Sequence, residues 1–190
     1  ISTSFFQNKV ILKLSKKFTE STNQKVFIEG INLNWNGSIE FKNFHLEDHH
    51  KDTLIYIQSL NTSLINLKNI KNRNFEFSDF VAEGLYLNLK KYNGEKTHSL
   101  KILLEKLKNK NNSKSLLKIN KMLIDKLTFF YVDENNVKSK PLKFNNLKIG
   151  AENFNLKNDE FIVTIKNLDG FIHSPFHKTI KGSAFVKYKP

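Results

Sequence analysis

A six-residue phrase recurs along this chain and constrains its fold more than any other feature. Apolar residues occupy its first, third and sixth positions, and Asn, Asp, Ser or Gly occupies the fifth. About three matches are expected by chance. We find eight, which indicates a repeated structural unit: Val26–Ile31, Ile39–Phe44, Ile55–Leu60, Ile65–Ile70, Phe75–Phe80, Phe80–Leu85, Leu142–Leu147 and Val163–Leu168.

The spacing within the phrase has a physical meaning. Successive side chains of a β-strand point to opposite faces, so the first and third residues share one face. The extra residue before the sixth position brings the next apolar residue back to that face, as a β-bulge or a sharp corner does. Many short, bent strands that share one apolar face predict a long, curved sheet.

The stretch from Val26 to Leu46 predicts the first hairpin. Apolar and polar residues alternate as far as Trp35 and again from Ile39. The Asn36–Gly37 pair between the two runs tolerates the positive φ angles of a tight turn. We therefore expect a β-hairpin with one apolar and one polar face.

The composition limits the classes of partner. The chain has 190 residues, 39% of them hydrophobic, which suits one domain or one section of an elongated protein. Its net charge is +13, and Arg73 is its only arginine. Because Arg is the usual reader of phosphates and guanine edges, nucleic acid is not the expected partner. Solvated lysines on strand edges and polar faces are favoured, and anionic lipid head groups also fit such a charge.

No pattern in the sequence predicts catalysis. The absence of Cys excludes disulfides, thiol catalysis and Cys-based zinc sites. The chain contains no Gly-x-Ser-x-Gly, P-loop, dinucleotide-binding or His-Glu-x-x-His motif. Its carboxylate pairs, Asp133–Glu134 and Asp159–Glu160, fall in predicted turns. We therefore expect no enzyme activity, no catalytic residues and no cofactor.

The densest titratable cluster runs from His45 to Asp52 and includes Glu47, Asp48, His49 and His50. Imidazoles and carboxylates this close together are possible ligands of a divalent metal. However, the segment from Glu47 to Asp52 has the composition of a hairpin turn, and no second group of ligands stands out elsewhere. The sequence alone therefore predicts no metal site.

Two segments have helical periodicity. Apolar residues recur every three or four positions between residues 4 and 20, with lysines on the opposite face. Such a basic amphipathic helix either caps a sheet, which is favoured, or lies on a membrane surface. The second segment contains Leu100, Leu103, Leu104 and Leu107 at helical spacing.

The remaining chain predicts about eleven short strands. Because their connections are short, the strands are expected to pair antiparallel, in a mostly β fold with about two helices. We expect four regions: an N-terminal amphipathic helix (1–22), a first β-meander (23–95), a helix and loop (96–115) and a second β-meander (116–190). The predicted strands are 26–35, 39–47, 53–67, 73–81, 83–92, 116–120, 122–132, 141–149, 151–157, 160–168 and 179–188.

Aromatic residues alternate with lysines in several of these strands. Such a pattern is also found in proteins that stack the bases of single-stranded nucleic acid. Here the phenylalanines fall at positions of the apolar face, where burial or an apolar binding face is the expected outcome. Base stacking is therefore not favoured.

Several segments resemble one known family. They are the hairpin quoted above with its continuation to Ser63, "Phe-Val-Ala-Glu-Gly-Leu-Tyr-Leu-Asn-Leu" (80–89) and "Ile-Asp-Lys-Leu-Thr-Phe-Phe-Tyr-Val-Asp-Glu-Asn" (124–135). Together with the preceding helix, they resemble the N-terminal portion of the TamB-like proteins, part of the AsmA-like group of Gram-negative envelopes. The likeness rests on the strand phrase and on the overall layout, over most of the chain.

The resemblance implies a fold, a location and partners. It implies an elongated, curved antiparallel sheet that forms a taco-like groove with the N-terminal helix as a cap. It also implies a periplasmic protein held in the inner membrane by an N-terminal anchor that this sequence lacks. The implied partners are phospholipids and an outer-membrane barrel of the TamA/BamA type, and the implied roles are lipid transport and outer-membrane protein assembly.

Sequence and resemblance together define a candidate lipid-binding face. An apolar sheet face with too few helices to cover it needs another apolar partner, and acyl chains fit that need. Lysines at the rims would meet phosphate head groups. The alternative is a closed β-sandwich in which the same residues form an ordinary core. The residues assigned to the face are Leu33, Trp35, Ile39, Phe41, Phe44, Leu46, Ile55, Ile57, Leu85, Leu87, Leu89, Phe144 and Ile165.

Two functions follow, in order of preference. The first is a section of a periplasm-spanning protein that shields acyl chains and supports phospholipid transport, outer-membrane assembly or both. The second is a structural or chaperone-like scaffold that offers sheet edges to outer-membrane proteins without carrying lipid. A basic nucleic-acid-binding domain is less favoured than either.

Overall fold

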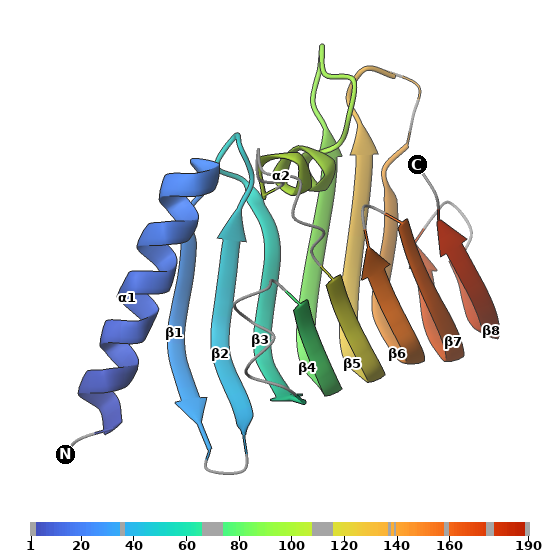
Figure 1. Ribbon diagram of the computed structural model, residues 1–190. Helices are drawn as coiled ribbons and strands as arrows, with labels where there is room; N and C mark the ends of the chain where they lie inside the picture. The colour runs from blue at the N-terminus through green and yellow to red at the C-terminus, as the bar shows by residue number, and fades with distance from the viewer. Residues whose placement is uncertain are drawn as a thin grey trace.

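The computed structural model of the chain contains one eight-stranded sheet and two helices (Figure 1). It describes residues 3–34, 37–65, 74–107, 116–136, 138, 140–157, 160–173 and 177–188. The strands lie in the sheet in their sequence order, and the sheet does not close on itself. The elements are α1 (Thr3–Thr22), β1 (Val26–Leu33), β2 (Ser38–Glu47), β3 (Thr53–Leu64), β4 (Asn74–Lys91), α2 (Ser99–Leu107), β5 (Leu116–Asp133), β6 (Leu142–Lys157), β7 (Glu160–His173) and β8 (His177–Tyr188).

The mostly β fold is confirmed, but the strands are fewer and longer than predicted. The predicted pair 73–81 and 83–92 is one strand, β4, and the pairs at 116–132 and 141–157 are likewise single strands, β5 and β6. The predicted breaks, at residues 82, 121 and 150, fall at paired positions inside the strands, so the hydrogen-bonded pairing continues through them. The left-handed residues that bend these strands lie elsewhere, at Gly84, Lys126, Asn146 and Asn153.

The bends confirm the meaning given to the phrase in part: three of its described occurrences have a left-handed residue at the fifth position, and those with Gly30, Ser59, Asp79 and Asn167 there do not. Asn43, Gly84 and Asn146 occupy its fifth position, and their φ angles are +46°, +64° and +52°. Lys126 and Asn153, at +56° and +57°, hold the equivalent place in two further segments. Asn and Gly tolerate this left-handed conformation, which explains their presence at these positions.

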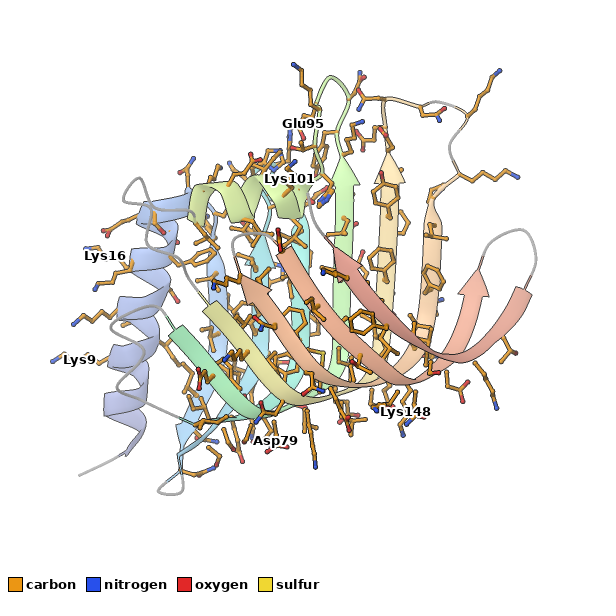
Figure 2. All side chains as sticks on the ribbon, turned by 45° about the vertical axis from the view of Figure 1, so that its right-hand side comes forward. Lys9, Lys16, Asp79, Glu95, Lys101 and Lys148 are labelled. Carbon is orange, nitrogen blue, oxygen red and sulfur yellow. The ribbon has the colours of Figure 1, made fainter. Side chains whose placement is uncertain are left out.

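Bends of neighbouring strands lie side by side. Asn43 of β2 and Gln58 of β3 fall in the same break between register pairs. Gln58 also faces Gly84 of β4, where an added Cβ atom would lie 2.8 Å from the Gln58 Cβ atom. Lys126 of β5 lies in the matching break of the β4–β5 register. Because the strands bend together, the sheet curls into the open trough seen in Figure 2.

One strand pairing corrects the antiparallel prediction. β4 and β5 are parallel, with Asn74 opposite Leu116 and Lys91 opposite Asp133, whereas the other six neighbouring pairs are antiparallel. A parallel pair needs a crossover rather than a short turn. The connection that contains α2 supplies this crossover.

The first hairpin is confirmed. β1 pairs with β2 from Val26–Leu46 to Leu33–Ile39. At its turn, Gly37 has a φ angle of +82°, and the backbone N–H of Asn34 donates to the Ser38 carbonyl at 2.9 Å. Trp35, predicted to lie in the first strand, is outside the described residues.

The two helices lie at one end of the sheet. α1 runs alongside β1, the first edge strand, as the capping prediction expects (Figure 1). α2 contributes Leu103, which is buried, and Leu100, which is half-buried, to a cluster with Leu46 and Leu54. Leu104 and Leu107, predicted on the same apolar stripe, are exposed, because the short helix presents only one narrow side to its neighbours.

Candidate functional site

Cross-strand pairing defines one apolar face of the sheet. Residues paired across neighbouring strands point to the same side of a sheet, so register alone assigns faces. One row crosses six strands as Val26, Leu46, Ile55, Leu87, Phe129 and Phe144. A second row crosses seven strands as Ile31, Phe41, Leu60, Ala82, Ile124, Ile149 and Leu168.

The bends keep these rows on the same face. Phe41 and Phe44 are three residues apart in β2, a spacing that would place them on opposite faces of a regular strand. The left-handed Asn43 between them resets the alternation, so Phe44 pairs with Ile57 on the side that Phe41 shares with Leu60. The apolar face therefore continues across the line of bends.

The predicted face residues fall on this surface as follows. Leu46 and Ile57 are buried, and nine others are half-buried. Leu33 pairs with Ile39 at the end of the first hairpin, and Trp35 lies outside the described residues. The half-buried residues are Ile39, Phe41, Phe44, Ile55, Leu85, Leu87, Leu89, Phe144 and Ile165.

The two ends of the apolar face differ in their cover. At the end near the helices, Leu54 is fully buried and Leu103 is 3% exposed, within a cluster that includes Phe18 of α1. Elsewhere, among the described residues, no second sheet or helix packs on the face, and its side chains are buried only against one another. The open sheet therefore does not form the closed sandwich that was the alternative.

The predicted list contains one buried residue of the central core, Ile57, and omits the other four: Ala82, Ile124, Leu127 and Leu147. Ile124 and Leu127 belong to the segment Met122–Leu127, which follows the phrase except that Lys126 stands at the fifth position. A phrase that also admits Lys at the left-handed position finds this segment.

The outer face of the sheet is mainly polar. Asp79 and Lys148 project from this outer side in Figure 2. Lysines on it pair with nearby acids: Lys126 with Glu83, Lys166 with Glu152 and Lys181 with Asp169. These lysines therefore lie behind the trough rather than at its rim. Phe41, Phe44 and Phe144 lie on the apolar face, whereas Phe27 and Phe185 are exposed on the outer face.

Two shallow depressions, of about 330 and 390 Å³, also lie on the outer face. Both are lined by Leu123, Gly150 and Asn167, which pair across β5, β6 and β7. Gly150 has no side chain, and this leaves space between its neighbours. Their charged lining residues include the ion pairs Lys166–Glu152 in one and Lys181–Asp169 in the other.

A polar cluster closes the end of the sheet near α2. It joins two turns, Asp48–Asp52 between β2 and β3 and Tyr92–Glu95 after β4. The Tyr92 hydroxyl lies 2.6 Å from Asp48 Oδ2 and 3.0 Å from Asp52 Oδ2. Lys90 Nζ donates to the same Asp52 oxygen. The turn predicted at Asp48–Asp52 is confirmed, and its acids hold the second turn in place.

Ionisation within this cluster follows from its contacts. The hydrogen bond from Lys90 lowers the pKa of Asp52, and that from Tyr92 lowers it further. Burial and the two acids raise the pKa of the Tyr92 hydroxyl, which therefore stays protonated and donates. Burial alone would raise the pKa of Glu95, but hydrogen bonds from His49 and His50 outweigh it, and the net shift is downward.

Comparison with known proteins assigns no family. No protein-family model matches the chain, and no curated protein matches its sequence. Among the described residues, neither helix combines the length and apolar character that crossing a bilayer requires.

Proposed function

We propose that this chain is a section of a periplasm-spanning envelope protein that shields lipid acyl chains against its apolar trough. The role would be phospholipid transport between the inner and outer membranes, support of outer-membrane protein assembly, or both. One observation carries the proposal: the apolar rows continue over at least six strands, whereas the helices cover one end only.

The dimensions of the face suit lipid. The rows run across the strands, along the length of the trough. With about 4.8 Å between strands, eight strands span on the order of 30 Å. This is about the thickness of the hydrocarbon core of a bilayer, so extended acyl chains fit along the rows. Each methylene group buried there contributes about 0.8 kcal/mol.

The half-buried state of the face supports the same function. Exposed apolar patches larger than a few hundred Å² are rare on soluble monomers and mark binding surfaces. Leu85, Leu87 and Phe144 keep part of their surface accessible, on a face that the described helices leave open. A lipid tail that lies on these residues removes that surface from water.

Native mass spectrometry with lipid extraction tests this proposal. The chain is purified from envelope membranes as the wild type and as the double variant Leu87→Glu/Phe144→Glu, which places two carboxylates on one row of the face. Val81→Glu is the matched control, because Val81 is 44% exposed on the outer face. Circular dichroism checks that each variant is folded.

The expected result is phospholipid at a defined stoichiometry on the wild type and on Val81→Glu, with its loss from the folded double variant. A lipid-free, folded wild-type chain would contradict lipid carriage. Equal lipid on the wild type and the double variant would show that lipid binds elsewhere. If the double variant unfolds, a photoreactive residue is placed at Leu87 or at Val81 instead. Lipid crosslinking from position 87 but not from position 81 would show that lipid binds on the apolar face.

A scaffold function is the second candidate, and the edge at β8 favours it. α1 lies alongside β1, but β8 pairs only with β7 among the described residues. Its Phe185 side chain is 67% exposed. Where a strand edge stays free, its backbone is a template for strand addition, and a neighbouring exposed aromatic residue offers an apolar contact. Photocrosslinking from Phe185 that captures an unfolded outer-membrane protein, in a chain free of lipid, would favour this function.

A further inference from the structure

We propose that His49, His50 and Glu95 bind a divalent transition-metal ion, with Zn²⁺ as the reference ion and one coordination position open to solvent. The three side chains come from the two turns of the polar cluster described above. Their possible ligand atoms all lie within 4.8 Å of one another. Two imidazoles and one carboxylate are a ligand set that zinc sites use.

The side chains converge on one point. His49 Nε2 lies 2.7 Å and His50 Nε2 lies 3.0 Å from the same oxygen, Glu95 Oε1. Zinc bonds of about 2.0–2.1 Å in a tetrahedral site separate neighbouring ligand atoms by about 3.3 Å. Each imidazole nitrogen therefore needs to move only about 0.3–0.6 Å away from Glu95 Oε1, a shift that side-chain rotation allows.

Two atoms of the cluster have unused hydrogen-bonding capacity. Glu95 Oε2 and His49 Nδ1 are buried and have no hydrogen-bond partner in the part of the chain that the structure describes. Buried polar atoms normally have a partner, so such exceptions need an explanation. An ion bound by both oxygens of the Glu95 carboxylate would satisfy Oε2.

The scaffold around the ligands is already fixed. Asp48 Oδ1 accepts the backbone N–H groups of His50, at 2.8 Å, and Asp52, at 3.0 Å, which shapes the turn. The Tyr92 ring packs against the His50 ring, with centroids 3.8 Å apart, and against the edge of His49 at 5.5 Å. Both imidazoles are therefore positioned before any ion binds, which lowers the ordering cost of binding.

A third turn positions Glu95. The side chain of Asn135, after β5, donates to the backbone carbonyls of Tyr92 at 3.2 Å and Glu95 at 3.1 Å. Asn135 Oδ1 also accepts the N–H of Gly94 at 2.8 Å. Figure 2 shows Glu95 at the end of the sheet that also carries Lys101 of α2. An ion at this place would tie the β2–β3 turn to the turn after β4.

The cluster is accessible to an ion. The His50 side chain is 48% exposed, whereas those of His49 and Glu95 are 15% and 23% exposed. An ion thus has an entry path past His50 and two less exposed ligands behind it. The sequence alone predicts no metal site because Glu95 is 45 residues from His50 and belongs to no visible ligand motif.

Titration of the tag-free chain with Co²⁺, followed by its visible ligand-field bands, tests the site, and competition with Zn²⁺ gives the affinity. The variants are His50→Gln and Glu95→Gln. His45→Gln is the control, because His45 lies on β2 outside the cluster and contacts Thr53 instead. Even outer-shell changes cost about 10–100-fold in metal affinity, so each ligand variant is expected to lose about 100-fold or more.

The expected result is one ion per chain, retained in His45→Gln, and a Zn²⁺-dependent rise in melting temperature that both ligand variants lose. No binding by the folded wild type would overturn the proposal and leave the cluster as a metal-free contact between turns. Binding that is unchanged in His50→Gln and Glu95→Gln would overturn it as well. These outcomes are independent of lipid binding, because the ligands lie in turns and not on the apolar face.

Discussion

The two ends of the apolar face bury their side chains in different ways. Near the helices, Leu46, Leu54 and Leu103 form a covered core in which side chains from α2 and two strands meet. Across β4 to β7, Ile124, Leu127 and Leu147 are buried although, among the described residues, no helix lies over them. There the curvature of the sheet brings neighbouring side chains together. One end is therefore sealed by added elements, and the other is compacted by bending.

This difference has consequences for stability and for function. At the covered end, burial depends on side chains contributed by the helices, whereas in the curved part it depends on the bending of the sheet. A face that is shaped by bending also remains open to a ligand, whereas the covered end does not.

The largest effect is expected from cavity formation at the covered end. Leu54→Ala removes a fully buried side chain and should lower the free energy of unfolding by about 2–5 kcal/mol. Leu87→Ala, at a half-buried position of the open face, should cost about 1 kcal/mol because less surface leaves the core. Urea unfolding of both variants measures the difference. Equal losses would contradict the distinction between the two ends.

An intermediate effect is expected at Gly170 of β7, which packs closely against Leu147 of β6. A Cβ atom at Gly170 would lie 2.3 Å from Leu147 Cδ2 and 3.0 Å from Leu147 Cα. Gly170→Ala should therefore lower the free energy of unfolding by about 1–3 kcal/mol through overpacking. Gly182→Ala is the matched control on β8, because no heavy atom lies within 4 Å of an added Cβ atom. Thermal unfolding compares the two, and similar melting temperatures would argue against a tightly packed curve.

The smallest effect is expected at the bend in β5. Lys126 has a φ angle of +56°, a conformation that Asn adopts more readily than Lys. Lys126→Asn should therefore raise the free energy of unfolding slightly, even though it loses a solvent-exposed ion pair with Glu83. Val81→Asn, on the outer face of β4, serves as the control for added polarity. A clear loss of stability in Lys126→Asn would show that the left-handed conformation of Lys126 does not limit the stability of the protein.

The sequence predicted some bends correctly but predicted strand ends where the strands continue. The spacing at Ile39–Phe44 and Leu142–Leu147 predicted bends at Asn43 and Asn146 because only a few residue types adopt the left-handed conformation at low cost. Strand ends were also predicted at residues 82 and 121, inside β4 and β5, where the pairing with the neighbouring strands continues. A single sequence does not show whether such pairing continues.

Of the two candidate sites, one was predictable from the sequence and the other was not. The apolar face was predictable because alternation and face assignment are local properties of a strand. The contact between His50 and Glu95 was not, because 45 residues separate them and no local pattern links the two turns.

The sequence by itself determined the β class, the first hairpin, both helices and the single apolar face, because these depend on residues a few positions apart. Only the tertiary structure decided that β4 and β5 run parallel, that the bends align into one trough and that three turns assemble a polar cluster. Those features depend on how distant segments pair in register, and the free energy of that pairing is shared among residues that are far apart in the chain.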